Sequence, residues 1–164
     1  MQEIRTPNTR ESILDTAEAL FAQQGHDGTS MRQITGAAGV NLASVNYHFG
    51  SKESLVQAVL KRRLEVLNRE RLRLLDELES QSGGKPLKPS LIVDAFFGTL
   101  LRLAADPAQA GSTFLPLLER TMTDPSDFIR ALFAEEYADV LERYRNALFA
   151  ALPDVPKACL LYTS

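Results

Sequence analysis

The chain of 164 residues is poor in the features that define several common classes of protein. Its single cysteine, Cys159, cannot form an internal disulfide or a cysteine metal cluster, which excludes a disulfide-stapled secreted fold. The N-terminal string MQEIRTPNTRES lacks the apolar segment of a signal peptide, and no window approaches about 18 uninterrupted apolar residues. We therefore expect no membrane partner, no membrane-spanning helix and a cytoplasmic location.

Residues that carry catalysis are also scarce. The only histidines are His26 and His48, and the strings HExxH, GxSxG, GxGxxG and the P-loop pattern do not occur. No spacing of histidine, cysteine or carboxylate residues matches a metal site. The sequence therefore predicts a protein that is not an enzyme, with no metal and no cofactor.

The composition is sufficient for a globular protein with a real core. Hydrophobic residues make up 45% and charged residues 24% of the chain, near the average for globular proteins. Lysine and arginine number 18 against 21 aspartates and glutamates, giving a net charge of −3. This charge excludes a protein that coats nucleic acid by bulk attraction, so any contact with DNA has to be local.

Three helices are expected in residues 10–50. Apolar residues at helical spacing predict the first, and Gly25 follows it at the position where a helix commonly ends. Ser30 and Gln33 have the spacing of a capping box at the start of the second helix, and Asn41 can cap the third. The last two helices are short and joined by a tight turn. This pattern predicts a helix-turn-helix, whose second helix fits a DNA major groove roughly 12 Å wide.

A longer helical body is expected after this head. Ser51 caps a helix of roughly 28 residues, about 40 Å long, which can connect two bodies. A loop over 80–90 precedes LIVDAFFGTLLRLAA at 91–105, which is apolar on nearly every side and predicts a helix buried inside a bundle. A shorter helix near 113–122 and a long one over 125–152 follow. No stretch alternates with period two for long enough to form a strand, so we predict an all-α fold.

The charge of the helix-turn-helix segment differs from that of the whole chain. Residues 29–52 contain Arg32 and Lys52 and no aspartate or glutamate, so the segment carries a charge of about +2 while the whole chain is negative. A polyanion can approach this segment.

The string TSMRQITGAAGVNLASVNYHFGSKESL, with the preceding ILDTAEALFAQQG, resembles the DNA-binding head of the TetR family of transcriptional regulators. The resemblance covers about residues 10–60. It implies an all-α homodimer with a helix-turn-helix DNA-binding domain over 1–50 and a helical ligand-binding and dimerisation bundle over 51–164. The part NLASVNYHFGSK is similar to a subgroup of fatty-acid-responsive repressors.

The resemblance also implies which residues contact double-stranded DNA. It makes 42–48 the recognition helix, with Asn46 able to pair with adenine N6 and N7 beside Ala43 and Ser44 at base edges. It implies phosphate contacts near the N-terminus of the second helix and after the recognition helix. The complete predicted set is Thr29, Ser30, Leu42, Ala43, Ser44, Asn46, Tyr47, His48 and Lys52.

Aromatic and aliphatic residues of the body are the candidate lining of an effector pocket. The set is Phe96, Thr99, Leu100, Leu103, Leu118, Met122, Phe133 and Tyr137. It supplies few charges, so we expect a small and mostly apolar effector with one polar end, such as a fatty acid or an acyl thioester. Ordinary core packing is the alternative for each residue. The basic run Lys61, Arg62, Arg63, Arg69, Arg71 and Arg73 is interpreted as a solvated helix face.

The function predicted from these features is a repressor that binds an inverted-repeat operator and is released by its effector. A TetR-like activator and a helical interaction protein without DNA affinity are the alternatives. Members of the family usually continue for several tens of residues beyond a helix such as 125–152, so we expect the regulatory domain to be incomplete. The terminal CLLYTS resembles translated library-adapter sequence, and we expect an impaired dimer where the full-length protein forms a homodimer.

Overall fold

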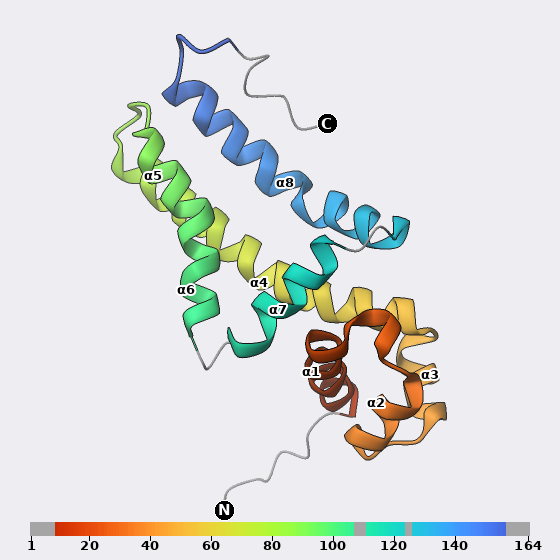
Figure 1. The fold of residues 1–164 in the computed structure, drawn as a ribbon. Helices are drawn as coiled ribbons and strands as arrows, with labels where there is room; N and C mark the ends of the chain where they lie inside the picture. The colour runs from red at the N-terminus through yellow and green to blue at the C-terminus, as the bar shows by residue number, and fades with distance from the viewer. Residues whose placement is uncertain (1–8, 107–110, 124–125, 157–164) are drawn as a thin grey trace, which may run out of the picture.

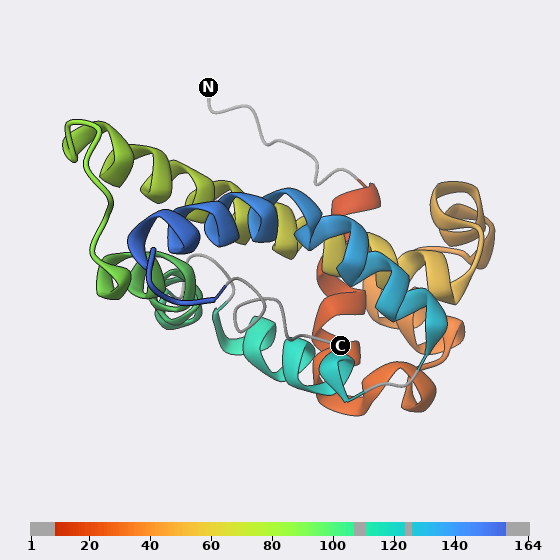
Figure 2. The same ribbon diagram turned by 90° about the horizontal axis from the view of Figure 1, so that it is seen from above.

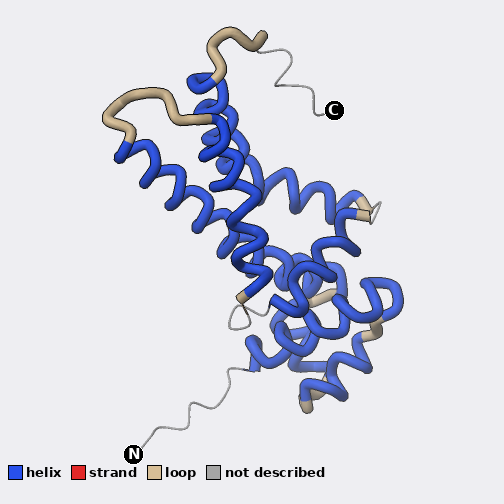
Figure 3. Tube along the Cα trace, turned by 60° about the vertical axis from the view of Figure 1, so that its left-hand side comes forward, coloured by secondary structure: helices blue, strands red, loops and turns tan. Residues whose placement is uncertain are grey.

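The computed structural model describes residues 9–106, 111–123 and 126–156, and within these ranges the chain forms helices and turns without a strand (Figures 1 and 3). This confirms the all-α fold predicted from the helical periodicity. The elements are α1 (Thr9–Gly28), α2 (Met31–Ala38), α3 (Leu42–Phe49), α4 (Lys52–Gln81), α5 (Pro89–Val93), the π-helical turn η1 (Asp94–Gly98), α6 (Thr99–Ala105), α7 (Gly111–Met122) and α8 (Asp127–Ala151).

The short helices α2 and α3 begin at the caps that the sequence predicts. Ser30 Oγ accepts a hydrogen bond from the Gln33 amide, and Gln33 Oε1 accepts one from the Ser30 amide, which is the reciprocal capping box. Gly39 ends α2 in the left-handed region, with φ 66°. Asn41 Oδ1 then accepts from the Ser44 amide at 2.7 Å and starts α3. Two short helices therefore form because local capping stabilises both ends of the turn between them.

The long helix α4 runs from the head into the body, where it lies beside α8 (Figures 1 and 2). Its first turns belong to the same buried core as Ile34 of α2 and Val45 of α3. That core also includes Leu117 of α7 and Ile129 of α8. Packing therefore crosses the predicted division at residues 50 and 51, because α4, α7 and α8 all bury apolar side chains against the three-helix head.

The expectation of a fully buried helix over 91–105 is wrong. The segment forms α5, η1 and α6, and it packs by one face, through Ile92, Ala95 and Thr99. The opposite stripe is exposed, with exposed fractions of 42% for Leu91, 60% for Phe97 and 65% for Leu101. Apolar composition does not encode how many neighbours surround a helix, and in the described part of the chain no element covers this stripe.

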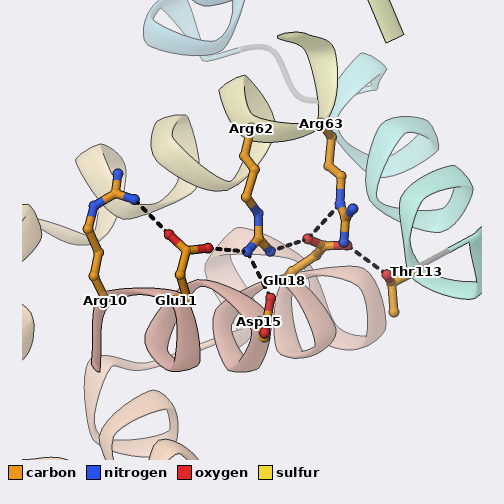
Figure 4. Close-up of polar contacts among 7 residues, drawn as sticks. All are labelled: Arg10, Glu11, Asp15, Glu18, Arg62, Arg63 and Thr113. Atoms are coloured by element: carbon orange, nitrogen blue, oxygen red, sulfur yellow. Dashed lines mark hydrogen bonds and ion pairs between the residues drawn. The ribbon is translucent and has the colours of Figure 1, made fainter. Parts of the chain in front are cut away.

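The interpretation of the α4 cations as a solvated face is wrong for Arg62, Arg63 and Arg71. Arg71 is buried, with an exposed fraction of 2%. Arg62 and Arg63 turn toward α1, where both bind Glu18 (Figure 4). Helical periodicity places these three residues on or next to the face that α1 and α8 cover, and aliphatic stems allow arginine to pack there.

Glu18 is a buried carboxylate that joins three helices (Figure 4). Arg62 Nη2 donates to its Oε2 at 2.7 Å, Arg63 Nε donates to its Oε1 at 3.0 Å, and Thr113 Oγ1 donates to its Oε1 at 2.7 Å. Burial by itself would raise the pKa of Glu18. Hydrogen bonds from Arg63, Thr113 and Arg62 outweigh burial and hold the pKa below its ordinary value. The carboxylate therefore stays ionised and ties α1 to α4 and α7.

Glu18→Gln is expected to lower the free energy of unfolding by about 3 kcal/mol, because it removes the buried negative charge to which Arg62 and Arg63 donate, while Arg62 keeps its ion pairs with Glu11 and Asp15. Since the pKa of Glu18 is lower in the folded chain, its stabilisation is present above about pH 4.5 and is lost as the pH falls through the folded pKa. Urea denaturation between pH 7 and pH 3 measures both effects.

Glu142→Gln is the matched control, because Glu142 is an exposed carboxylate on α8. Equal stability of the two variants at pH 7, or an acid transition in Glu18→Gln as steep as in the wild type, would contradict the role assigned to Glu18.

Candidate nucleic-acid interface

The helix-turn-helix presents one face of α3 to solvent. Val45 is fully buried and Phe49, one turn later, is partly buried against the head core. The side chains of Ala43, Asn46 and Tyr47 lie on the other side of the same short helix and are exposed. This division follows from helical geometry, in which residues four apart share a face.

The exposed face of α3 carries side chains that suit DNA. Tyr47 is 86% exposed, which is unusual for a large aromatic side chain, and its ring contacts His48 edge-on at 5.2 Å between centroids. Asn46 and Leu42 are exposed beside them, and Ser44 is half-buried. Of the predicted α3 residues, the structure therefore leaves all but Ser44 exposed to solvent.

The N-terminus of α2 is also accessible. Ser30 is exposed, but its amide and its hydroxyl are engaged with Gln33 in the capping box. The first-turn amides of Met31 and Arg32 lack acceptors within the helix, as in any α-helix, and point toward its N-terminal end. Arg32 itself is exposed. The predicted DNA-contacting residues do not include Arg32, although it is one of the two cations in the acid-free segment 29–52.

Thr29 has a structural position that does not support the phosphate contact predicted for it. Its exposed fraction is 1%, and its Oγ1 donates to the Gly25 carbonyl at 2.8 Å. Gly25 interrupts α1 with φ 75°, a conformation that favours glycine. The Thr29 hydroxyl therefore closes the turn between α1 and α2.

Lys52 also stabilises this turn. Its Nζ donates to the His26 carbonyl at 2.9 Å and to the Thr29 carbonyl at 3.1 Å. An ammonium has three N–H groups, so one remains beyond these two bonds. Lys52 thus holds the start of α4 against the end of α1, a role that residue spacing alone did not reveal.

The predicted effector residues fall into two neighbouring groups. Leu100, Leu103, Leu118 and Phe133 surround Leu67 and Phe114 in one cluster, and Phe96 and Tyr137 lie in the next cluster along α8. Thr99 is buried and donates to the Ala95 carbonyl. Met122 is 74% exposed, so its assignment to a pocket is wrong. It stands at the last turn of α7, where the chain leaves the body.

Arg71 lies between the aromatic residues of the second group. Its guanidinium carbon is 3.9 Å from the centroid of the Phe96 ring and 5.5 Å from that of Tyr137. Its Nε donates to the Phe96 carbonyl at 2.9 Å, and its Nη1 donates to Asn68 Oδ1 at 3.2 Å. Within the described ranges no carboxylate forms an ion pair with it. A region predicted from its apolar residues therefore contains a buried positive charge.

A cavity of about 440 Å³ lies outside the predicted effector residues, where the end of α1 meets α7. No set of three histidine, cysteine or carboxylate side chains that could hold a metal occurs among the residues described. In the same ranges no helix is long and apolar enough to cross a membrane.

Comparisons with known families match both parts of the chain. Residues 13–59 match the model of bacterial regulatory proteins of the tetR family, and residues 94–162 match a tetracyclin repressor-like C-terminal domain. These matches confirm the resemblance found in the helix-turn-helix residues. The second match lies in the body, beyond the residues 10–60 that carried the resemblance. The terminal CLLYTS lies outside the described residues.

Individual proteins similar to the chain agree with this. The chain is 43% identical over 58 residues to the HTH-type transcriptional repressor KstR2 of Rhodococcus jostii. The aligned residues make up 35% of this chain and 28% of KstR2. The chain therefore aligns with less than a third of that relative's length.

Two solved structures share the fold of the chain over most of its length. One is a TetR-family transcriptional regulator from Bordetella parapertussis, with a TM-score of 0.62, 23% identity, and coverage of 91% of this chain and 71% of that chain. The other is the fatty acid degradation regulator FadR from Bacillus halodurans, with a TM-score of 0.61 and 18% identity. The match covers 94% of this chain and 77% of that chain.

Lys52→Met is expected to lower the free energy of unfolding by about 2 kcal/mol, because two carbonyls lose a charged hydrogen-bond donor. Amide hydrogen exchange in α2 should accelerate more than exchange in α8, since the lost bonds hold the turn before α2. Lys85→Met, in the exposed loop after α4, is the control. Unchanged stability together with lost DNA affinity would instead assign Lys52 to phosphate contact alone.

Proposed function

The chain belongs to the TetR family of bacterial regulatory proteins, and from this membership we propose that it is a ligand-responsive transcriptional repressor that binds an inverted-repeat operator. The observation that carries the proposal is the exposed face of α3, where Asn46, Tyr47 and His48 stand outward from a packed helix-turn-helix. The matched family consists of regulatory proteins, which agrees with the expectation that the chain is not an enzyme.

The proposed contacts with DNA divide into two kinds. Asn46 pairs with an adenine edge and Ala43 approaches a thymine methyl group in the major groove. Tyr47, His48 and the N-terminus of α2 contact phosphates and set the register of the head on the duplex. The acid-free segment 29–52 supplies the local positive charge that a chain with a net charge of −3 needs at this surface.

A homodimer accounts for the inverted repeat, because two heads related by a two-fold axis read two half-sites about 34–36 Å apart or a multiple of that distance. The similarity to KstR2, which is named as a repressor, favours repression over activation. A regulator of bacterial promoters acts where the chromosome lies, so the proposed location is the cytoplasm.

The proposed effector is a long-chain fatty acid bound in the body. The apolar side chains of Leu100, Leu103 and Phe133 provide contacts for an acyl chain, and Arg71 provides a cation for its carboxylate. A buried charge is costly without an opposite charge, so an acid is favoured over an acyl thioester, whose carbonyl is neutral.

Selection from a random duplex library tests DNA binding directly. The enriched sequences are expected to contain an inverted repeat, and affinity should fall steeply as salt rises because phosphate contacts release counterions. Recovery of no motif would favour the helical interaction protein. A promoter reporter compared with and without the protein then separates repression from activation.

Asn46→Ala is expected to cost about 1–3 kcal/mol of binding free energy on the selected operator and to relax specificity at one base position. Binding isotherms on the operator and on single-base variants measure this. Asn146→Ala, an exposed asparagine on α8, is the matched control. A loss of equal size on every sequence would show that Asn46 does not read a base.

Oleate at about 100 times its dissociation constant is expected to raise the free energy of unfolding by about 2.7 kcal/mol, measured as a thermal shift. Methyl oleate should stabilise the chain less, because it lacks the charge that Arg71 binds. Arg71→Met should remove the preference for the acid, whereas Arg69→Met, an exposed control two residues away, should retain it. Equal stabilisation by acid and ester would overturn the role of Arg71.

A further inference from the structure

Gly36 lies in the middle of α2, a helix of eight residues, where glycine favours the helix less than any other residue except proline. Its backbone does not require glycine, because Gly36 is not one of the glycines with a positive φ. Packing does not require glycine either, because a Cβ built on Gly36 would meet no atom within 4 Å. The chain itself therefore gives no reason for the missing side chain.

The other glycines with described surroundings do have such a reason. Of the eight in this set, five have a positive φ, and two, Gly28 and Gly98, have a close neighbour where a Cβ would lie. Glycine is also used where another molecule approaches the backbone closely. Within the described set, Gly36 is the one that calls for an explanation from outside the chain.

Arg32 stands one turn before Gly36 on the same face of α2. Both residues are exposed, on the side of the helix opposite the buried Ile34. A helical side chain covers the surface over the turn that precedes its own Cα, so a side chain at position 36 would cover the turn that carries Arg32. Gly36 therefore leaves the approach to Arg32 open.

The position of Arg32 favours an anion and not the stability of α2. Arg32 lies in the first turn of the helix, which contains no aspartate or glutamate. The positive end of the helix dipole disfavours a cation there and attracts an anion. In the part of the chain that the structure describes, no carboxylate forms an ion pair with Arg32. The guanidinium is therefore available to an anion from another molecule.

We propose that Gly36 is a positioning residue for DNA, which keeps the outer face of α2 clear so that a phosphate of the duplex reaches Arg32. In a helix-turn-helix the first of the two helices crosses the DNA backbone, and α2 is that helix. The phosphate accepts hydrogen bonds from the Arg32 guanidinium. The inference rests on the proposed DNA binding and assigns a role to two residues outside the predicted DNA-contacting set.

Gly36→Leu tests the clearance, and Ala37→Leu is the matched control, because Ala37 is the next residue of α2 and is also exposed. Binding isotherms are measured for the complete chain on the selected operator and on an unrelated duplex of equal length, at several salt concentrations. Gly36→Leu should bind both duplexes about tenfold more weakly, as the loss of one charged hydrogen bond implies. Its plot of log affinity against log salt should flatten by about one unit of slope. Ala37→Leu should bind as the wild type does.

Arg32→Gln separates an effect through Arg32 from an independent one. This variant should show the same loss of affinity and the same flatter salt dependence as Gly36→Leu. If Gly36 acts by opening access to Arg32, the double variant should bind as Arg32→Gln alone does. Independent effects would instead multiply to a loss of about 100-fold.

Gly36→Ala separates folding from binding. Alanine favours a helix more than glycine does, so the thermal midpoint should rise by about 2–4 °C. The same variant should bind both duplexes less tightly than the wild type, because its methyl group lies over the turn of Arg32. Gain of stability with loss of affinity keeps the test decisive if leucine at position 36 disturbs the fold.

Three results would overturn the inference and leave the proposed DNA binding standing. They are equal affinity and salt dependence for Gly36→Leu and Ala37→Leu, a loss confined to the operator, and a double variant whose loss is the product of the two single losses. Failure of the wild type to bind either duplex would overturn the inference and the proposed function together.

Discussion

The buried carboxylate of Glu18 is the interaction on which the arrangement of this protein depends (Figure 4). It receives hydrogen bonds from α4 through Arg62 and Arg63 and from α7 through Thr113. Apolar packing alone is non-directional and lets helices slide and rotate. An ion pair with several donors has one geometry in which all are satisfied, so Glu18 sets how the head is rotated on the body.

The end of α1 extends this control to the helix-turn-helix. Three side chains from different parts of the chain, Thr29, Lys52 and Arg120, donate to carbonyls between Leu20 and Thr29. Carbonyls at a helix C-terminus lack N–H donors within the helix and carry partial negative charge, so cations stabilise them. These hydrogen bonds hold the end of α1 to α7 and to the start of α4, next to the N-terminus of α2.

The body contains a buried cation, Arg71, among apolar side chains. Arg71 stands at helical spacing from the buried Leu67 and Leu75 of α4, whereas Arg69 and Arg73 are exposed. Its burial depends on Phe96 and Tyr137, which come from two other helices and cover the guanidinium with their rings. A region chosen for its lack of charge is therefore centred on a cation.

The sequence by itself determined the features that depend on neighbouring residues. The capping box of Ser30 and Gln33 and the cap at Asn41 are confirmed because each is a contact within a few residues of the chain. The TetR resemblance is confirmed for the same reason, since its motif is one continuous stretch of residues. Tertiary structure alone decided which faces are covered. It buried Thr29 and Arg71, exposed Met122, Phe97 and Leu101, and opened a cavity at the junction of head and body. Burial is a property of elements that meet in space from distant parts of the chain, and helical periodicity specifies a face without specifying what packs on it.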